Sequence, residues 1–150
     1  MKNVIKGIKM LRQCGLCLFI LFFISFYTST EEYYVSKSGN DSNPGTLSSP
    51  WLTIQKAADT LVAGDTVYIR SGTYNERVRP KNSGSSVNYI TYTNYSNDTV
   101  TIDGNGITLP YDWGGLVDIS YKNYIKINGL RVINAGPHDN NSGILVDFCN

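Results

Sequence analysis

Short runs of alternating apolar and polar residues, separated by Gly, Asn and Asp, dominate the chain after its first thirty residues. Such runs are typical of half-buried strands, because successive side chains of a strand point to opposite faces of a sheet. The turn residues between the runs mark where strands end. The predicted strands are Tyr33–Ser36, Thr66–Arg70, Asn88–Thr93, Val100–Asp103, Leu116–Ser120, Tyr124–Asn128, Leu130–Ile133 and Ile144–Cys149.

One segment follows a helical pattern instead. Its apolar residues recur three and four positions apart, which places them on one face of a helix. Thr53 is suited to cap the amino end and Gly64 to end the helix. We therefore predict a helix over Thr53–Ala63, preceded by a loop over residues 38–50 that is rich in Gly, Asn, Ser and Pro.

The predicted strands recur at intervals of 23 to 29 residues. Ile102-Asp103-Gly104 resembles Ile127-Asn128-Gly129 at an offset of 25, and Leu116–Ile119 resembles Leu145–Phe148 at an offset of 29. Further apolar pairs are spaced similarly: Val78 with Ile102, Val67 with Ile90, and Ile90 with Val117. Three short strands in each interval predict a parallel β-solenoid, whose coils bury their apolar faces by stacking.

Two features refine the solenoid prediction. Turn residues such as Asn128 are expected to stack from coil to coil through their side-chain amides. The helix is expected to cover the first coil, because an open solenoid end is a bare sheet edge. The alternative is an antiparallel β-barrel or sandwich, in which Asn-Gly and Asp-Gly pairs would form hairpin turns.

The first thirty residues have the order of a secretory signal. Met1–Gln13 is basic, Cys14–Phe26 is apolar, and Tyr27–Thr30 is mostly small and polar. Thirteen apolar residues are short for a bilayer span, but an uncleaved signal anchor stays open as an alternative. We predict a signal peptide or anchor over 1–30, a strand, loop and capping helix over 31–64, and coils over 65–150. The protein is thus expected to be secreted or at the cell surface, with membrane contact only through an uncleaved anchor.

Composition and charge narrow the function classes. The chain has 13 basic and 12 acidic residues, and the part after residue 30 has nine basic and twelve acidic ones. This balance argues against a nucleic-acid-binding surface. The abundance of Gly, Asn, Ser, Thr and Tyr excludes a helical bundle or coiled coil.

A set of motifs lies in Tyr34–Thr46, Trp51–Ala58, Ala63–Ile69, Gly72–Tyr74 and Ser86–Gly104. Together they resemble secreted right-handed parallel β-helix proteins of the pectin-lyase superfamily, and in particular its polysaccharide lyases. The resemblance implies an all-β, right-handed parallel β-helix with three sheets and an N-terminal capping helix.

The resemblance also implies a range of activities. The superfamily includes lyases of pectate, alginate or chondroitin-type chains, in which a cation, often calcium, neutralises a uronate carboxylate while a Lys or Arg removes the neighbouring proton. Those residues lie on middle coils of a longer helix. The sequence accounts for only about three and a half coils, so we expect an N-terminal fragment, truncated at its C-terminal end, and assign no catalytic residue.

The expected function is that of an exported carbohydrate-interacting β-helix protein whose partner is an extracellular or cell-envelope polysaccharide. If the full-length protein is an enzyme, a calcium-dependent polysaccharide lyase is the expected activity. The first alternative is a non-enzymatic cell-surface or adhesin-like solenoid. The second is the inactive product of a degraded gene.

Two pairs of residues are candidate ligand-binding residues. Asp118 and Asp147 occupy equivalent places in the repeated Leu-Val-Asp, so they are expected to stack on adjacent coils and to offer carboxylates to a calcium ion. Solvated carboxylates that point apart are the alternative. Tyr111 and Trp113 lie in a loop and are candidates for stacking on a sugar ring, or else for packing over the solenoid wall.

Other polar residues have structural interpretations. Asp103 is expected to stabilise its own turn. His138 has no catalytic or metal-binding partners around it in the sequence. Arg77, Arg79 and Lys81 form a basic cluster near Glu76, which could contact an acidic polymer or lie at a solvated edge.

Overall fold

The computed structural model describes residues 29–109, 114–136 and 141–148. One helix and nine strands form within these residues. In chain order they are β1 (Glu32–Val35), α2 (Ile54–Thr60), β2 (Thr66–Ile69), β3 (Gly72–Tyr74), β4 (Ile90–Asn94), β5 (Val100–Asp103), β6 (Gly115–Asp118), β7 (Ile125–Asn128), β8 (Leu130–Ile133) and β9 (Ser142–Leu145). Across the described ranges, no helix is both long enough and apolar enough to cross a bilayer. The predicted signal over 1–30 falls almost entirely outside them.

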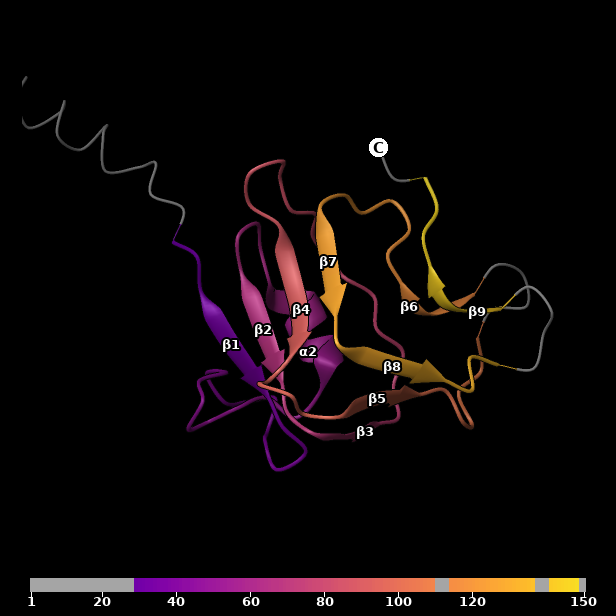
Figure 1. The fold of residues 1–150 in the computed structure, drawn as a ribbon, viewed down its shortest axis with the longest axis horizontal. Helices are drawn as coiled ribbons and strands as arrows, with labels where there is room; N and C mark the ends of the chain where they lie inside the picture. The colour runs from indigo at the N-terminus through magenta and orange to yellow at the C-terminus, as the bar shows by residue number, and fades with distance from the viewer. Residues whose placement is uncertain (1–28, 110–113, 137–140, 149–150) are drawn as a thin grey trace, which may run out of the picture.

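The strands form three parallel sheets, as Figure 1 shows. The first has the order β1-β2-β4-β7, the second β3-β5-β8 and the third β6-β9. Every pairing is parallel, and the chain passes from one sheet to the next in each coil. The three-sheet β-helix is therefore confirmed, and the antiparallel alternative is excluded.

The predicted register is wrong, although every predicted strand overlaps an observed one. The bounds of the last strand also differ, because it was predicted over Ile144–Cys149 and β9 spans Ser142–Leu145. Ile102 pairs with Tyr74 of the preceding coil and with Val132 of the following coil, rather than with Val78 and Ile127. The resemblance of residues 102–104 to residues 127–129 reflects two strand ends in different sheets. Loops of unequal length between the strands make the repeat irregular, so no single offset identifies the stacked pairs.

The same correction applies to the first sheet. Ile90 pairs with Ile125, rather than with Val67 and Val117. Val67 pairs with Tyr92 at an offset of 25. Alternation still places the correct residues inside, because Val67, Ile90 and Tyr92 are all at most 3% exposed.

The helix begins where it was predicted and ends earlier. Thr53 caps it, because Oγ1 accepts a hydrogen bond from the Lys56 amide at 3.1 Å. It ends at Thr60 because Leu61 is extended, with a ψ of 143°. The buried Asp65 carboxylate then accepts the Val62 amide at 2.9 Å, which fixes the turn that leads into β2.

The helix covers the start of the third sheet. Its Ile54, Ala57 and Ala58 are buried in the core. The Ala58 carbonyl accepts the Lys81 amide at 2.9 Å, and Val78 forms a parallel bridge with Val117 of β6. The helix, the segment around Val78 and β6 therefore follow one another along this side of the solenoid.

Polar side chains stack at the turn around Asp103, rather than at the turn of Asn128 where stacking was predicted. Asn75 donates to the Asp103 carbonyl at 2.8 Å, and Asn134 donates to the Asp103 carboxylate at 2.8 Å. The bond from Asn134, together with that from the Asn105 amide, lowers the pKa of Asp103. The Asn105 bond is the local turn interaction expected for Asp103.

Two buried tyrosines predict opposite responses to loss of a hydroxyl. The Tyr74 hydroxyl donates to the Arg70 carbonyl at 2.9 Å, whereas the Tyr92 hydroxyl is buried without a hydrogen-bond partner among the described residues. Burial raises the pKa of both phenols. Tyr74→Phe is expected to lower the free energy of unfolding by about 1 kcal/mol, and Tyr92→Phe to leave it unchanged or raise it. Urea denaturation of the two variants checks this; an equal loss in both would contradict the assignment.

Glu76 supports the helix and predicts a pH effect. Its carboxylate accepts the Ile54 and Gln55 amides at 3.0 and 2.8 Å, yet burial raises its pKa above 4.5. The folded state therefore holds this proton more tightly than the unfolded state. Relative to Glu76→Gln, the wild type is expected to lose stability as the pH rises from 4.5 through the raised pKa, and then to level off. Thermal unfolding at a series of pH values checks the direction; a relative gain over that window would contradict it.

Candidate functional site

A groove of about 870 Å³ lies between the helix and the outer side of the third sheet. Its lining comes from four places: the helix, the segment after β3, the end of β6 with the turn that follows it, and the end of β9 with the residues after it. The lining residues are Gln55, Asp59, Arg77, Arg79, Pro80, Lys81, Asp118, Ser120, Tyr121, Lys122, Leu145, Asp147 and Phe148.

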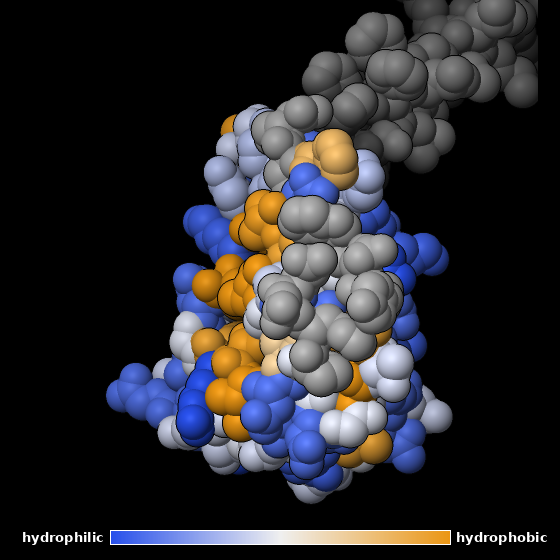
Figure 2. Space-filling view, turned by 90° about the vertical axis from the view of Figure 1, so that its right-hand side faces the viewer, coloured by the Kyte–Doolittle hydropathy of each residue, from blue (hydrophilic) through white to orange (hydrophobic). Residues whose placement is uncertain are grey.

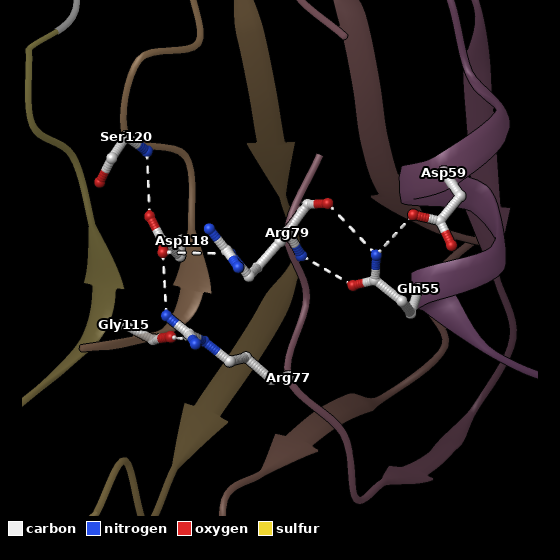
Figure 3. A network of polar contacts seen from close by, with 7 residues as sticks. All are labelled: Gln55, Asp59, Arg77, Arg79, Gly115, Asp118 and Ser120. Atoms are coloured by element: carbon white, nitrogen blue, oxygen red, sulfur yellow. Dashed lines mark hydrogen bonds and ion pairs between the residues drawn. The ribbon is translucent and has the colours of Figure 1, made fainter. Parts of the chain in front are cut away.

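Asp118 is the centre of the polar network in this groove (Figure 3). One carboxylate oxygen accepts from Arg77 at 2.9 Å and lies 3.4 Å from Arg79 Nε. The other oxygen accepts the Ser120 amide at 3.1 Å. The side chain of Asp118 is 10% exposed. Both oxygens are thus engaged by groups of the protein itself.

The two arginines have different environments. Arg77 is largely covered and also donates to the Gly115 carbonyl at 2.9 Å. Burial lowers the pKa of Arg77, and the Asp118 charge opposes that effect. The Arg79 side chain is 64% exposed and lines the groove. A guanidinium has five donors, which leaves Arg79 donors for a ligand.

The helix holds Arg79 in place through its backbone. Gln55 Oε1 accepts the Arg79 amide at 2.8 Å, and Gln55 Nε2 donates to the Arg79 carbonyl at 3.2 Å (Figure 3). Gln55 Nε2 also donates to the Asp59 carboxylate at 2.9 Å, and this bond orients the Gln55 side chain. The groove therefore presents Arg79 from a fixed main chain.

Cations and aromatic rings line the rest of the groove. Lys122 Nζ donates to the Lys81 carbonyl at 3.0 Å, which brings these two lysines to the same wall. Tyr121 and Phe148 stack with ring centres 4.9 Å apart, and they are 66% and 67% exposed. Cationic donors beside apolar rings suit a ligand that combines carboxylates with the apolar faces of sugar rings.

The predicted stacking of Asp118 on Asp147 is wrong. The register pairs Asp118 with Leu145 and Val117 with Ile144, which is an offset of 27 rather than 29. The parallel course continues beyond β9, where the Tyr121 amide donates to the Asp147 carbonyl at 2.9 Å. Both aspartates line the groove, but within the described ranges no group of three or more His, Cys, Asp or Glu could hold a metal ion. Calcium binding by Asp118 and Asp147 stays a prediction, but the stacking of the two carboxylates from which it was inferred is wrong.

The other predicted ligand-binding residues cannot be placed, because Tyr111 and Trp113 lie outside the described residues. His138, for which no site was predicted, lies outside them as well. The sugar-stacking prediction for Tyr111 and Trp113 therefore stays untested. Figure 2 shows the side of the molecule toward which β5 and β8 run, where a band of hydrophobic residues lies among polar ones.

The basic cluster has a role that the sequence did not assign to it. Glu76 binds the helix amides, whereas Arg77 and Arg79 bind Asp118, which is about forty residues away along the chain. No periodicity links these positions, and the predicted offsets did not align them. Only the contact of the segment around Val78 with β6 brings them together.

The parallel sheets define a β-helix scaffold, and comparison with known proteins identifies its family. Residues 33–149 match the "Pel9A-like, right handed beta helix region" family, and the chain belongs to this family. It is 38% identical over 104 residues to an uncharacterised protein, YwoF, of Bacillus subtilis, covering 69% of this chain and 22% of that one. It is 31% identical over 118 residues to "Pectate lyase PEL9" of Emericella nidulans, covering 71% of this chain and 28% of that one.

A solved structure agrees with the sequence relatives. The structure of a rhamnogalacturonan lyase matches with a TM-score of 0.58 and 26% identity, covering 68% of this chain and 28% of that one. The chain thus spans between a fifth and a third of the length of these three relatives. The resemblance to polysaccharide lyases of the pectin-lyase superfamily is confirmed.

Proposed function

We propose that the chain belongs to an exported β-helix protein that binds an acidic polysaccharide in the groove beside Arg79. The observation that carries this proposal is the exposed guanidinium of Arg79, whose backbone is held by Gln55 and whose side chain is held by Asp118. A fixed cation loses less conformational freedom on binding than a mobile one. Lys81 and Lys122 add charge along the same wall.

A uronate polysaccharide fits these groups chemically. Its carboxylates recur along the chain, so several can meet cations in one groove, and Arg binds carboxylates through paired hydrogen bonds. The names of two relatives, a pectate lyase and a rhamnogalacturonan lyase, support a ligand of this kind. Export is supported by the basic, apolar and polar order of the first thirty residues.

Calorimetric titration with oligogalacturonate tests the proposal. Arg79→Ala is expected to weaken binding by about ten- to a hundredfold, because a charged hydrogen bond to the ligand is worth roughly 1.5–3 kcal/mol. Arg131→Ala is the matched control, since Arg131 is exposed on β8 and does not line the groove. The proposal fails if the wild type does not bind, or if the two variants lose affinity equally.

Catalysis is a separate question for the full-length protein. A calcium-dependent lyase would release unsaturated uronate ends, which absorb in the ultraviolet. Binding without such ends would favour the non-enzymatic cell-surface or adhesin-like solenoid. Calcium titration of the wild type and Asp118→Asn tests the metal prediction, and equal heats would remove Asp118 from it.

A further inference from the structure

The chain enters the fold beside two tyrosines at one edge of the first sheet. Because its strands are parallel, their amino ends meet at the same edge, which lies at the top of Figure 1. The register aligns Glu32, Thr66, Thr91 and Lys126. Two residues earlier, the corresponding row is Thr30, Gly64, Tyr89 and Tyr124.

Direct contacts support this row. The Gly64 amide donates to the Tyr89 carbonyl at 3.2 Å, and the Ile90 amide donates to the Tyr124 carbonyl at 3.1 Å. A Cβ on Gly64 would lie 3.0 Å from Thr30 Cγ2. Thr30, at which the N-terminal segment joins the fold, is therefore next to Gly64 and in the same row as both tyrosines.

Four exposed large hydrophobic residues belong to this row or come two residues before it in the chain, and we call them the amino-edge patch. Val62 and Val87 are 53% and 83% exposed, and Tyr89 and Tyr124 are 37% and 39% exposed. The two tyrosine rings meet edge to face at 5.6 Å, and Lys126 Nζ lies 4.5 Å from the centre of the Tyr89 ring. Clustered exposed apolar residues mark interaction surfaces, and Tyr with Lys is typical of a membrane interface.

The length of chain before Thr30 places this patch relative to the apolar run. Phe26, the last residue of the run, is four residues from Thr30, so their Cα atoms are at most about 14 Å apart. Across the sheet, Tyr89 and Tyr124 lie roughly 10 and 14 Å from Thr30, at about 4.8 Å per strand. If the run enters a bilayer, the patch is within reach of the bilayer surface.

The apolar run is also too short to act alone. A helix of its thirteen residues would be about 20 Å long, whereas the hydrocarbon core of a bilayer is about 30 Å thick. Stable attachment through weak signals generally takes two of them acting together. The patch supplies a second apolar surface on the same side of the fold.

We propose that the amino-edge patch docks on the lipid bilayer that retains the N-terminal apolar run, so that the β-helix is held against the membrane at this edge. The proposal rests on the export step of the proposed function and is independent of glycan binding. It predicts that Val87, the most exposed of the four residues, lies in the headgroup region.

The test uses the full chain in phosphatidylcholine vesicles that contain headgroup-labelled nitroxide lipid. The three native cysteines are replaced by alanine, and an environment-sensitive fluorophore is attached to Val87→Cys or to Asn97→Cys. Asn97 is the matched control, because it is exposed in the turn after β4, at the opposite end of that strand. Strong quenching at position 87 and little at position 97 is the expected result; equal quenching, or none at either position, would overturn the proposal.

Two further measurements keep the outcome decisive. Tyr89→Ser combined with Tyr124→Ser, in the labelled Val87→Cys chain, is expected to reduce quenching while circular dichroism stays unchanged. The mass of the protein recovered from cells shows whether residues 1–28 are retained; a processed chain found only in the medium would also overturn the proposal. Vesicle docking needs no glycan, so its failure is distinguishable from failure of the proposed groove.

Discussion

Ile102→Ala is expected to destabilise the protein by about 2–5 kcal/mol, which is the range for truncating a buried Ile or Leu. Ile102 is fully buried and is paired in the second sheet with residues of the coils below and above, so the resulting cavity is enclosed by packed side chains. Small domains have only about 5–15 kcal/mol of stability in total. The variant is therefore expected to be largely unfolded well below the melting temperature of the wild type.

Ile144→Ala is the matched control for this prediction. Ile144 lies on β9 and is 44% exposed, so the same truncation there is expected to cost well under 2 kcal/mol. Chemical denaturation of both variants gives the comparison. Similar losses would mean that the difference in burial between Ile102 and Ile144 has been assigned wrongly.

Asp118→Ala is expected to have the second-largest effect, on stability and on the groove together. It leaves Arg77, whose side chain is only 22% exposed, without its carboxylate partner, and it frees Arg79. We expect a loss of about 1–3 kcal/mol, below the range for fully buried pairs because both arginines retain some solvent contact. Oligogalacturonate affinity is expected to fall as well, since Arg79 is no longer positioned.

Two comparisons isolate the role of Asp118. Glu32→Ala removes an exposed carboxylate whose contacts with two tyrosine hydroxyls are 3.3 and 3.4 Å long, and it is expected to change stability by less than about 0.5 kcal/mol. Replacing both Arg77 and Asp118 by Leu is expected to give a more stable protein than Asp118→Ala, because no largely buried charge is left unpaired. Equal losses in Asp118→Ala and Glu32→Ala would show that the ion pairs contribute nothing.

The sequence predicted the strands well because alternation and turn residues are local signals. Val100–Asp103 and Leu130–Ile133 form strands with the predicted bounds. The short strand Gly72–Tyr74 was not predicted, since three residues cannot establish an alternation. The early end of the helix depends on Asp65, whose buried carboxylate binds the Val62 amide.

The register and the site could not be predicted in the same way. Stacked partners depend on the length of every loop between them, so the turn motifs ending at Gly104 and Gly129 suggested a false pairing. Arg79 and Asp118 meet only because the segment around Val78 runs beside β6. The fold was accessible from pattern and resemblance, whereas the groove required three-dimensional contacts.

Hydrogen–deuterium exchange with and without saturating oligogalacturonate tests the central claim most directly, because it locates the ligand on the wild-type protein. The account predicts slower exchange in residues 77–81 and 118–122, which line the groove, and unchanged exchange in β1, β2 and β4. Protection confined to the first sheet, or binding without protection in the two groove segments, would contradict it.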